Sequence, residues 1–126
     1  MRIISGTARG TKLFTLEGLE TRPTLDRVKE AIFNIIQSQI RDAVVLDLFA
    51  GSGAIGLEML SRGAKKAILC DKSKSAMEII KKNIEKTHMD EKVKLYNLDF
   101  EKCIEKVKND KFDIIYLDPP YNTDYI

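Results

Sequence analysis

The sequence has 126 residues, about the size of one globular domain, with 44% hydrophobic and 32% charged residues. This mixture excludes collagen-like and disordered chains, and no uncharged stretch approaches the roughly 20 apolar residues of a membrane span. The N-terminus lacks the apolar segment of a secretory signal, and Cys70 and Cys103 form no CxxC pair. We therefore expect a cytoplasmic protein with reduced thiols, no membrane partner and no metal.

Positive charge is concentrated at the start of the chain. Residues 1–41 contain seven Lys and Arg against four Asp and Glu, and four of the six arginines lie in the first 27 residues. Arginine forms bidentate contacts with phosphate, whereas scattered lysines usually form a solvated surface. The segment is a candidate nucleic-acid arm; ordinary surface arginines are the alternative.

The hydrophobic pattern predicts secondary structure in chain order. Residues 1–20 alternate glycine turns with short apolar patches, which is typical of a small hairpin or extended arm. Apolar residues then recur at helical spacing over 25–40, with Thr24 as the expected N-cap. Further on, we expect strands at 43–48, 67–71, 93–97 and 112–117, and helices at 54–62, 73–87 and 100–109. Ser75 and Glu78 have the spacing of a capping box. This alternation predicts an α/β fold, a parallel sheet with helices on both faces.

Carboxylates follow the predicted strands. Asp47, Asp71 and Asp118 lie at or just past the ends of the first, second and fourth strands, and Asp99 lies just past the third. Ligands of open α/β sheets bind outside the carboxyl ends of the strands. We therefore expect a binding site at this edge.

A glycine-rich turn follows the first strand. Residues 51–56 match G-x-G-x-x-G and open a helix, and Asp71 lies 20 residues after Gly51. Glycines let backbone amides approach a ligand at a helix N-terminus. Taken alone, the turn fits a nicotinamide dinucleotide, S-adenosylmethionine or an ordinary strand–helix connection.

The longer stretch from Asp47 to Gly53 resembles motif I of the class I S-adenosylmethionine-dependent methyltransferases, whose fold is Rossmann-like. Its acid would repel a pyrophosphate but suits an ammonium group. The resemblance implies that Asp71 holds the ribose and that Asp99 accepts from the adenine amino group, with Phe100 packed on the ring. The cofactor-binding residues expected on this basis are Asp47, Phe49, Gly51, Gly53, Asp71, Lys72, Asp99 and Phe100.

The motif Asp118-Pro119-Pro120-Tyr121 resembles the (D/N)PP(Y/F) motif of enzymes that methylate exocyclic amino groups of bases or amide nitrogens. The Asp118 carboxylate and the Pro119 carbonyl would accept hydrogen bonds from the amine and aim its lone pair at the methyl group. Pro119 and Pro120 would keep the loop stiff, and Tyr121 would stack on a flipped base. The alternative is that these residues form an ordinary Pro-Pro turn after a strand, without a catalytic role.

Residues 1–6, 9–10 and 22–34 closely resemble the RsmD-type guanine-N2 methyltransferases of small-subunit (16S) ribosomal RNA, and the resemblance runs to about residue 122. It implies methylation of one guanine by S-adenosylmethionine, with the assembled small subunit as the favoured substrate. The expected RNA-binding residues are Arg2, Arg9, Lys12, Arg22 and Arg27; the last two could instead lie beside the methionine end of the cofactor.

The expected organisation has two parts. Residues 1–41 form an RNA-contacting arm and amphipathic helix, and residues 42–126 form an S-adenosylmethionine-binding core. The family fold has three more strands after this point, so the core is expected to be C-terminally incomplete. Three other functions stay open: an adenine-N6 methyltransferase of DNA or RNA, a NAD-dependent oxidoreductase, and a non-catalytic RNA-binding remnant.

Overall fold

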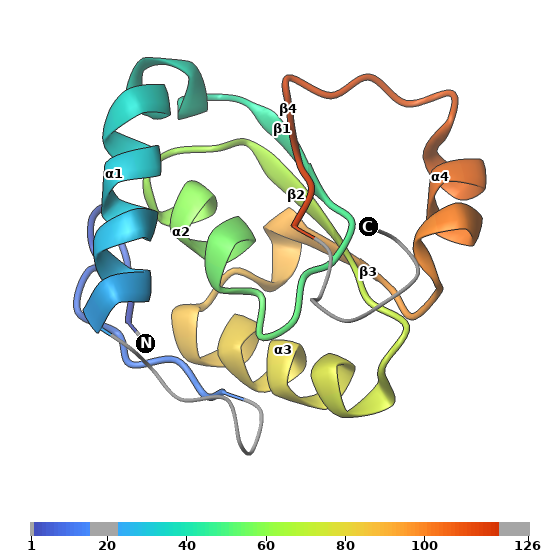
Figure 1. Ribbon diagram of the computed structural model, residues 1–126, viewed down its shortest axis with the longest axis horizontal. Helices are drawn as coiled ribbons and strands as arrows, with labels where there is room; N and C mark the ends of the chain where they lie inside the picture. Colours follow the sequence, from blue (N-terminus) through green and yellow to red (C-terminus); the bar gives the residue numbers. More distant parts are fainter. Residues whose placement is uncertain (1, 16–22, 119–126) are drawn as a thin grey trace.

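The computed structural model describes residues 2–15 and 23–118, with side chains of the first helix described from residue 27 onward. Its elements in chain order are α1 (Pro23–Ile40), β1 (Val44–Asp47), α2 (Ala54–Ser61), β2 (Lys66–Cys70), α3 (Lys74–Thr87), the short 3₁₀ helix η1 (Asp90–Lys92), β3 (Val93–Tyr96), α4 (Phe100–Val107) and β4 (Ile114–Tyr116) (Figure 1). The strands form one sheet in the order β3-β2-β1-β4, and every pairing is parallel. The predicted α/β fold is confirmed.

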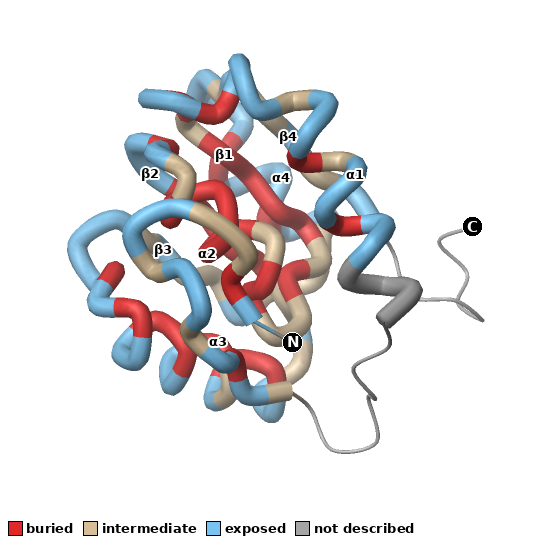
Figure 2. Tube along the Cα trace, turned by 90° about the vertical axis from the view of Figure 1, so that its left-hand side faces the viewer, coloured by how far each residue is buried: buried red, intermediate tan, exposed pale blue. Residues whose placement is uncertain are grey.

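Helices cover both faces of this sheet. Successive residues of a strand point to opposite faces. Accordingly, Val45 of β1 belongs to a core cluster that includes Phe33 of α1 and residues of α2 and α3, whereas Leu46 belongs to a second cluster with Cys103 of α4. Figure 2 shows β1 as a buried strand through the middle of the molecule. A strand buried on both faces needs a continuous apolar run, which the sequence supplies at this position.

Helix α2 lies very close to the sheet because of Gly56. A Cβ atom at this position would be 2.4 Å from Cδ2 of Leu69 in β2, and Leu69 is fully buried. The third glycine of the turn motif therefore permits close helix–strand packing. This packing holds the N-terminus of α2 beside the carboxyl end of β1.

Two predicted helix caps were wrong. Helix α1 begins at Pro23, so Thr24 lies inside the helix; proline is favoured at a first helical position, where its missing N–H costs nothing. In α3 the N-cap is Ser73, whose Oγ accepts from the amide of Ala76 at 3.2 Å, and not the predicted Ser75. The amide of Ser73 donates to Oδ1 of Asp71 at 2.9 Å, which sets the chain in the extended conformation that a cap requires.

The N-terminal residues form the predicted hairpin. Arg2 and Lys12 form an antiparallel bridge, and the amide of Ile3 donates to the carbonyl of Thr11 at 2.9 Å. Ile3 and Leu13 are buried in the same cluster as α1, α2 and α3. We call residues 2–15 the arm; it packs as part of the core.

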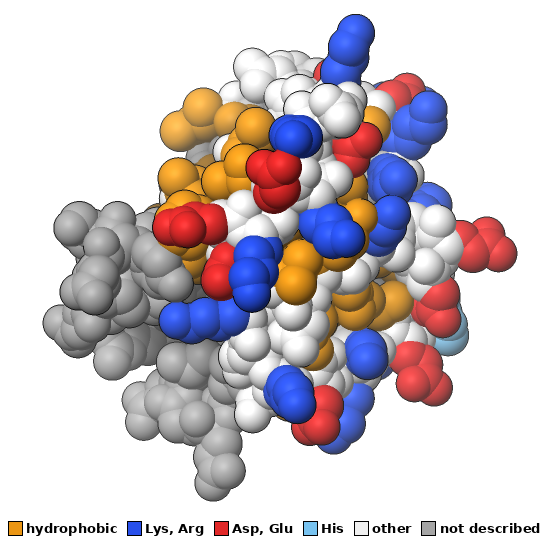
Figure 3. Space-filling view, turned by 90° about the vertical axis from the view of Figure 1, so that its right-hand side faces the viewer, with side chains coloured by type: hydrophobic (Ala, Val, Ile, Leu, Met, Phe, Trp, Pro, Cys, Tyr) orange, Lys and Arg blue, Asp and Glu red, His pale blue; other side chains and the backbone are white. Residues whose placement is uncertain are grey.

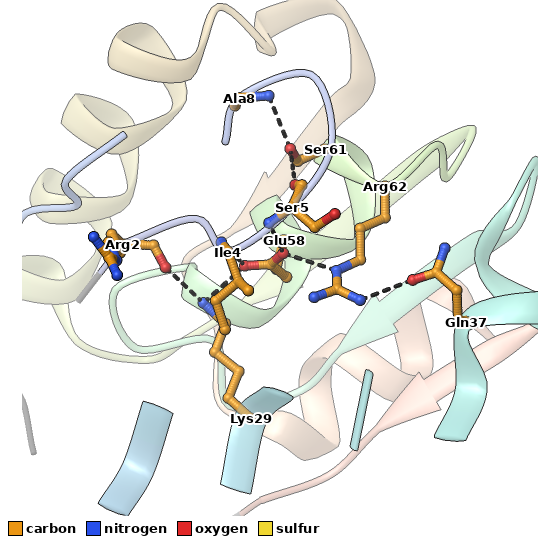
Figure 4. A network of polar contacts seen from close by, with 9 residues as sticks. All are labelled: Arg2, Ile4, Ser5, Ala8, Lys29, Gln37, Glu58, Ser61 and Arg62. Carbon is orange, nitrogen blue, oxygen red and sulfur yellow. Dashed lines mark hydrogen bonds and ion pairs between the residues drawn. The ribbon is translucent and has the colours of Figure 1, made fainter. Parts of the chain in front are cut away.

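A buried carboxylate fastens the arm to α1 and α2 (Figure 4). Oε1 of Glu58 accepts from the amide of Ile4 at 2.8 Å and lies 3.1 Å from Nζ of Lys29. Oε2 accepts from the amide of Ser5 at 3.1 Å and from Nε of Arg62 at 2.8 Å. Burial favours a higher pKa for Glu58, but the Arg62 hydrogen bond, the Ile4 amide and Lys29 outweigh it and lower this pKa below its usual value. Glu58 is therefore an ionised link with a donor or a cation at each oxygen.

Candidate active site

The carboxyl ends of the strands form one edge of the sheet, and a cleft opens there. Its volume is about 300 Å³. Four of the predicted site residues line it: Asp47, Phe49, Gly51 and Asp118. Parallel register places Asp47 of β1 beside Tyr116 of β4, two residues before Asp118. The structure thus brings together, in one cavity, Asp47 before the glycine turn and Asp118 at the start of the Asp-Pro-Pro-Tyr motif.

Asp47 is buried in an acidic environment. It is 1% exposed, and its Oδ1 accepts from the amide of Phe49 at 3.1 Å. Burial raises the pKa of Asp47 to about 7; the Phe49 bond works against this rise, and the charges of Asp71 and Asp118 add to it. A carboxylate in this situation is stabilised by a cationic ligand group.

The glycine turn has the backbone conformation that its sequence predicts. Gly53 is the N-cap of α2 with φ of 82°, in the left-handed region that glycine adopts without strain. Its amide donates to the carbonyl of Ala50 at 2.8 Å. Ala54 and Ile55, in the first turn of α2, line the cleft, so the positive end of the α2 dipole lies there.

Asp71 joins two loops of this edge. Its Oδ2 accepts from the amide of Gly51 at 2.9 Å, and its Oδ1 accepts from the amide of Ser73 at 2.9 Å. Each carboxylate oxygen has a second lone pair for a ligand hydroxyl. Lys72, between these loops, is exposed.

Asp99 and Phe100 lie at the start of α4. Asp99 is its N-cap, since Oδ1 accepts from the amide of Lys102 at 2.9 Å. The Phe100 ring packs against Phe49, with ring centroids 5.6 Å apart and planes inclined by 34°. The thiol of Cys70 donates to the carbonyl of Leu98 at 3.2 Å and so fixes the segment that leads into the cap. Phe100 therefore contacts a residue that lines the cleft, whereas neither Phe100 nor Asp99 lines the cleft itself.

Sequence reasoning missed two charged or polar residues of the cleft. Lys29 of α1 and Tyr116 of β4 line it, alongside the apolar side chains of Val28 and Ile32. Burial, followed by the charges of Asp118 and Asp47, raises the pKa of Tyr116. Tyr116 and Asp118 are two positions apart, so the period-two rule for strands was a signal that could have identified this tyrosine.

The predicted RNA-binding residues are accessible where the structure describes them. Arg2, Arg9, Lys12 and Arg27 are exposed, and the hairpin places Arg2 beside Lys12. By contrast, the face that carries α4 mixes Lys and Arg with Asp and Glu (Figure 3), including a pair between Lys108 and Glu105 at 2.7 Å. The predicted residues Arg22, Pro119, Pro120 and Tyr121 lie outside the described residues.

The described part of the chain has neither a metal-binding cluster nor a membrane-spanning helix. Among the described side chains, those of residues 2–15 and 27–118, no three His, Cys, Asp or Glu are grouped so that they could hold a metal ion. Within residues 2–15 and 23–118, no helix is both long enough and apolar enough to cross a membrane.

Comparison with known proteins identifies the family of the chain. The model of the family described as Conserved hypothetical protein 95 matches residues 1–126. The chain is 40% identical over 126 residues to ribosomal RNA small subunit methyltransferase D of Haemophilus influenzae, covering 97% of this chain and 64% of that protein. It thus spans about two thirds of the length of the curated relatives it matches.

Solved structures share the fold. A hypothetical protein of Thermus thermophilus superimposes with a TM-score of 0.86 and 30% identity, over 98% of this chain and 71% of that one. A SAM-dependent methyltransferase from Agrobacterium tumefaciens gives a TM-score of 0.66 with 26% identity, over 79% of this chain and 33% of that one. The sheet is therefore the Rossmann-like sheet of class I methyltransferases, and the chain belongs to the RsmD family of ribosomal RNA methyltransferases.

Proposed function

We propose that this chain forms the cofactor- and base-binding part of an enzyme that methylates N2 of a guanine in small-subunit ribosomal RNA, with S-adenosylmethionine as the methyl donor. The observation that carries the proposal is the cleft shared by Asp47 and Asp118. Two carboxylates in one cavity support the proposal, because Asp47 is suited to the cofactor and Asp118 to the amine. The names of the relatives supply the class of RNA.

The residues at this edge fit the cofactor. Asp47, whose pKa is raised to about 7 by burial, is stabilised by the ammonium group of the methionine moiety. Asp71 accepts from the ribose hydroxyls, and Asp99 accepts from the adenine amino group. Phe49 and Phe100 pack against the adenine, and Gly51 and Gly53 let backbone amides approach; exposed Lys72 lies beside Asp71. The bound cofactor supplies a methyl group already activated on a sulfonium.

Asp118 acts on the amine. The lone pair of an exocyclic amino group is delocalised into the base, so the nitrogen is a poor nucleophile. Asp118 and the carbonyl of Pro119 accept hydrogen bonds from its two hydrogens, draw the nitrogen toward sp³ geometry and aim its lone pair at the methyl group. Pro120 keeps this loop stiff, and Tyr121 stacks on the base.

The arm and α1 supply the RNA contacts. Arg2, Arg9, Lys12, Arg22 and Arg27 bind phosphates, with the assembled small subunit in the cytoplasm as the natural partner. The acidic cleft disfavours the NAD-dependent alternative, because Asp47 and Asp118 would repel a pyrophosphate.

The deciding experiment is methyl transfer by the full-length gene product. Labelled S-adenosylmethionine is incubated with small subunits from cells that lack the enzyme, and the nucleosides are then analysed. We expect label on guanine N2, and a rate loss of about 10²–10³ in Asp118→Ala with unchanged cofactor affinity. Asp110→Ala, at an exposed acid before β4, is the control and should keep full activity.

Other outcomes point elsewhere. Label on adenine N6 would transfer the protein to that class of methyltransferase. Full activity in Asp118→Ala would rule out the proposed role of this carboxylate. Tighter binding of NAD than of S-adenosylhomocysteine in calorimetry would exclude the cofactor assignment.

A further inference from the structure

We propose that Asn83 is a positioning residue that couples the backbone of the arm to the glycine turn of the cofactor site, so that cofactor affinity depends on the arm. The proposal rests on the function proposed above. Asn83 lies on α3, is fully buried and is not among the residues that line the cleft. A buried amide is costly unless its hydrogen bonds are made, so its partners show what it does.

The side chain of Asn83 joins two distant segments. Its Oδ1 accepts from the amide of Phe14 at 2.7 Å, and its Nδ2 donates to the carbonyl of Phe14 at 2.9 Å. The same Nδ2 donates to the carbonyl of Ser52 at 2.8 Å. The amide group can be oriented in only one way here, because an N–H must meet oxygen and two carbonyls need donors. Both N–H donors are thus used, one for the arm and one for the turn.

The Ser52 carbonyl is an effective point at which to fix the turn. Ser52 lines the cleft and lies between Gly51 and Gly53, with φ of 58° and 82°. Glycines lose the most conformational entropy on ordering, so this turn needs external support. Because the peptide unit is planar, holding the Ser52 carbonyl also sets the direction of the Gly53 amide.

The arm, which Asn83 joins to the glycine turn, is itself held in place by α2. The hydroxyl of Ser61 donates to the carbonyl of Ser5 at 2.6 Å and accepts from the amide of Ala8 at 2.9 Å, at the opposite end of the arm from Phe14. Figure 4 shows these bonds beside the Glu58 network. The arm is therefore fixed at its turn by α2 and at its exit by Asn83. A shift of the Phe14 backbone is therefore transmitted through Asn83 to the Ser52 carbonyl.

The experiment compares changes from both sides of the link. Asn83→Leu removes the amide with little change in volume. Phe14→Pro removes the backbone donor while the side chain, 46% exposed, lies outside the core. The dissociation constant of S-adenosylhomocysteine is measured by calorimetry well below the unfolding midpoint of each variant. We expect weakening on the order of tenfold for Asn83→Leu and threefold for Phe14→Pro. The double variant should be little weaker than Asn83→Leu, because both changes break one link.

Two control variants separate coupling from general loss of structure. Thr87→Val removes a buried hydroxyl one turn along α3, whose bonds are to the carbonyls of Asn83 and Ile84 in the same helix. Phe14→Ala removes the ring that lies under Nζ of Lys86 but keeps the backbone donor. Both should bind the ligand within about twofold of the wild type, a difference well below that of one hydrogen bond.

Hydrogen exchange keeps failure of this inference distinct from failure of the proposed function. In the ligand-free protein, the Gly53 amide hydrogen should exchange faster in Asn83→Leu than in the wild type. In Thr87→Val it should exchange at the wild-type rate. If the wild type binds no S-adenosylhomocysteine, the cofactor assignment fails, and this exchange result still decides the role of Asn83. Wild-type affinity in folded Asn83→Leu and Phe14→Pro would overturn the inference, and so would equal weakening by Phe14→Ala and Phe14→Pro.

Discussion

Two buried carboxylates at opposite ends of α2 have opposite surroundings. Glu58, near the C-terminal end, is fully buried and bonded to two backbone amides and the cations of Lys29 and Arg62. Asp47, beside the N-terminal end, is 1% exposed and accepts from one amide, and the neighbouring charges that shift it belong to acids. The pKa of Glu58 is lowered, while burial raises that of Asp47 to about 7.

This difference in surroundings distinguishes a carboxylate that stabilises the fold from one that is left for a ligand to compensate. Burying a charge is costly unless it is paired and hydrogen-bonded. Glu58 meets that condition within the chain and so joins the arm, α1 and α2. Asp47 accepts only one hydrogen bond from an amide, and the charges that shift its pKa are acidic. In the function proposed above, the ammonium group of the cofactor supplies the missing counter-charge, so binding would depend on an acid that destabilises the ligand-free protein.

The largest expected effect is at the structural carboxylate. Glu58→Gln leaves Lys29 and Arg62 buried without their counter-charge, so it should lower the free energy of unfolding by about 3–5 kcal/mol. Chemical denaturation measures this loss. Glu85→Gln, at an exposed position on α3, is the control and should change it by less than about 0.5 kcal/mol. A loss below about 1 kcal/mol in Glu58→Gln, in the range of exposed ion pairs, would contradict the assigned role.

The opposite result is expected at the cleft. Asp47→Asn should weaken binding of S-adenosylhomocysteine about 30-fold or more, because a buried charge pair with the ligand ammonium is lost. The same change should raise the unfolding midpoint of the ligand-free protein at pH 8. Calorimetry and thermal unfolding test the two parts, with Asp90→Asn in exposed η1 as the control. Loss of both affinity and stability would return Asp47 to a structural role.

The pH dependence sharpens the comparison. Because burial raises the folded-state pKa of Asp47 from 3.8 to about 7, the folded protein keeps the proton over this interval while the unfolded chain has lost it. Ionisation of Asp47 in the unfolded chain therefore lowers the free energy of unfolding as pH rises from about 4 to 7. The stability advantage of Asp47→Asn should grow by about 1.4 kcal/mol per pH unit over this range and level off above it. Denaturation series from pH 5 to 8 measure the free energy of unfolding of the wild type and of Asp47→Asn. A difference between them that does not change with pH would show that the pKa of Asp47 is not raised.

The smallest effect is expected at the arm surface. Replacing Arg2, Arg9 and Lys12 by alanine should flatten the salt dependence of RNA binding by about one unit of slope per lost phosphate contact. Affinity for S-adenosylhomocysteine should stay unchanged, since these side chains are exposed and the Glu58 and Asn83 links remain. The control is the triple alanine variant of Lys102, Lys106 and Lys108 on the mixed-charge α4 face. If both triple variants change the slope equally, the arm has no special part in RNA binding.

Short-range patterns made much of the site predictable. Asp47, the glycine turn and Asp71 could be placed because each is next to an apolar strand, and parallel strands bring their carboxyl ends to one edge. Lys29 and Asn83 could not be placed, since their roles depend on packing between segments far apart in the chain. Glu58 left a signal, as a charged residue inside the otherwise apolar segment 54–60. The predicted N-cap at Ser75 was wrong because a local hydrogen bond from the Ser73 amide to Asp71 holds Ser73 in the capping conformation, two residues earlier.

The two hydrogen bonds that Asp71 accepts, from the amides of Gly51 and Ser73, have a consequence for the timing of ligand exchange. Ordering a loop costs conformational entropy, and here that cost falls on folding rather than on ligand binding. The two loops that Asp71 joins are consequently ordered before any ligand arrives. In the function proposed above, ligand binding therefore does not have to order these two loops, and a spent ligand leaves them ready for the next one.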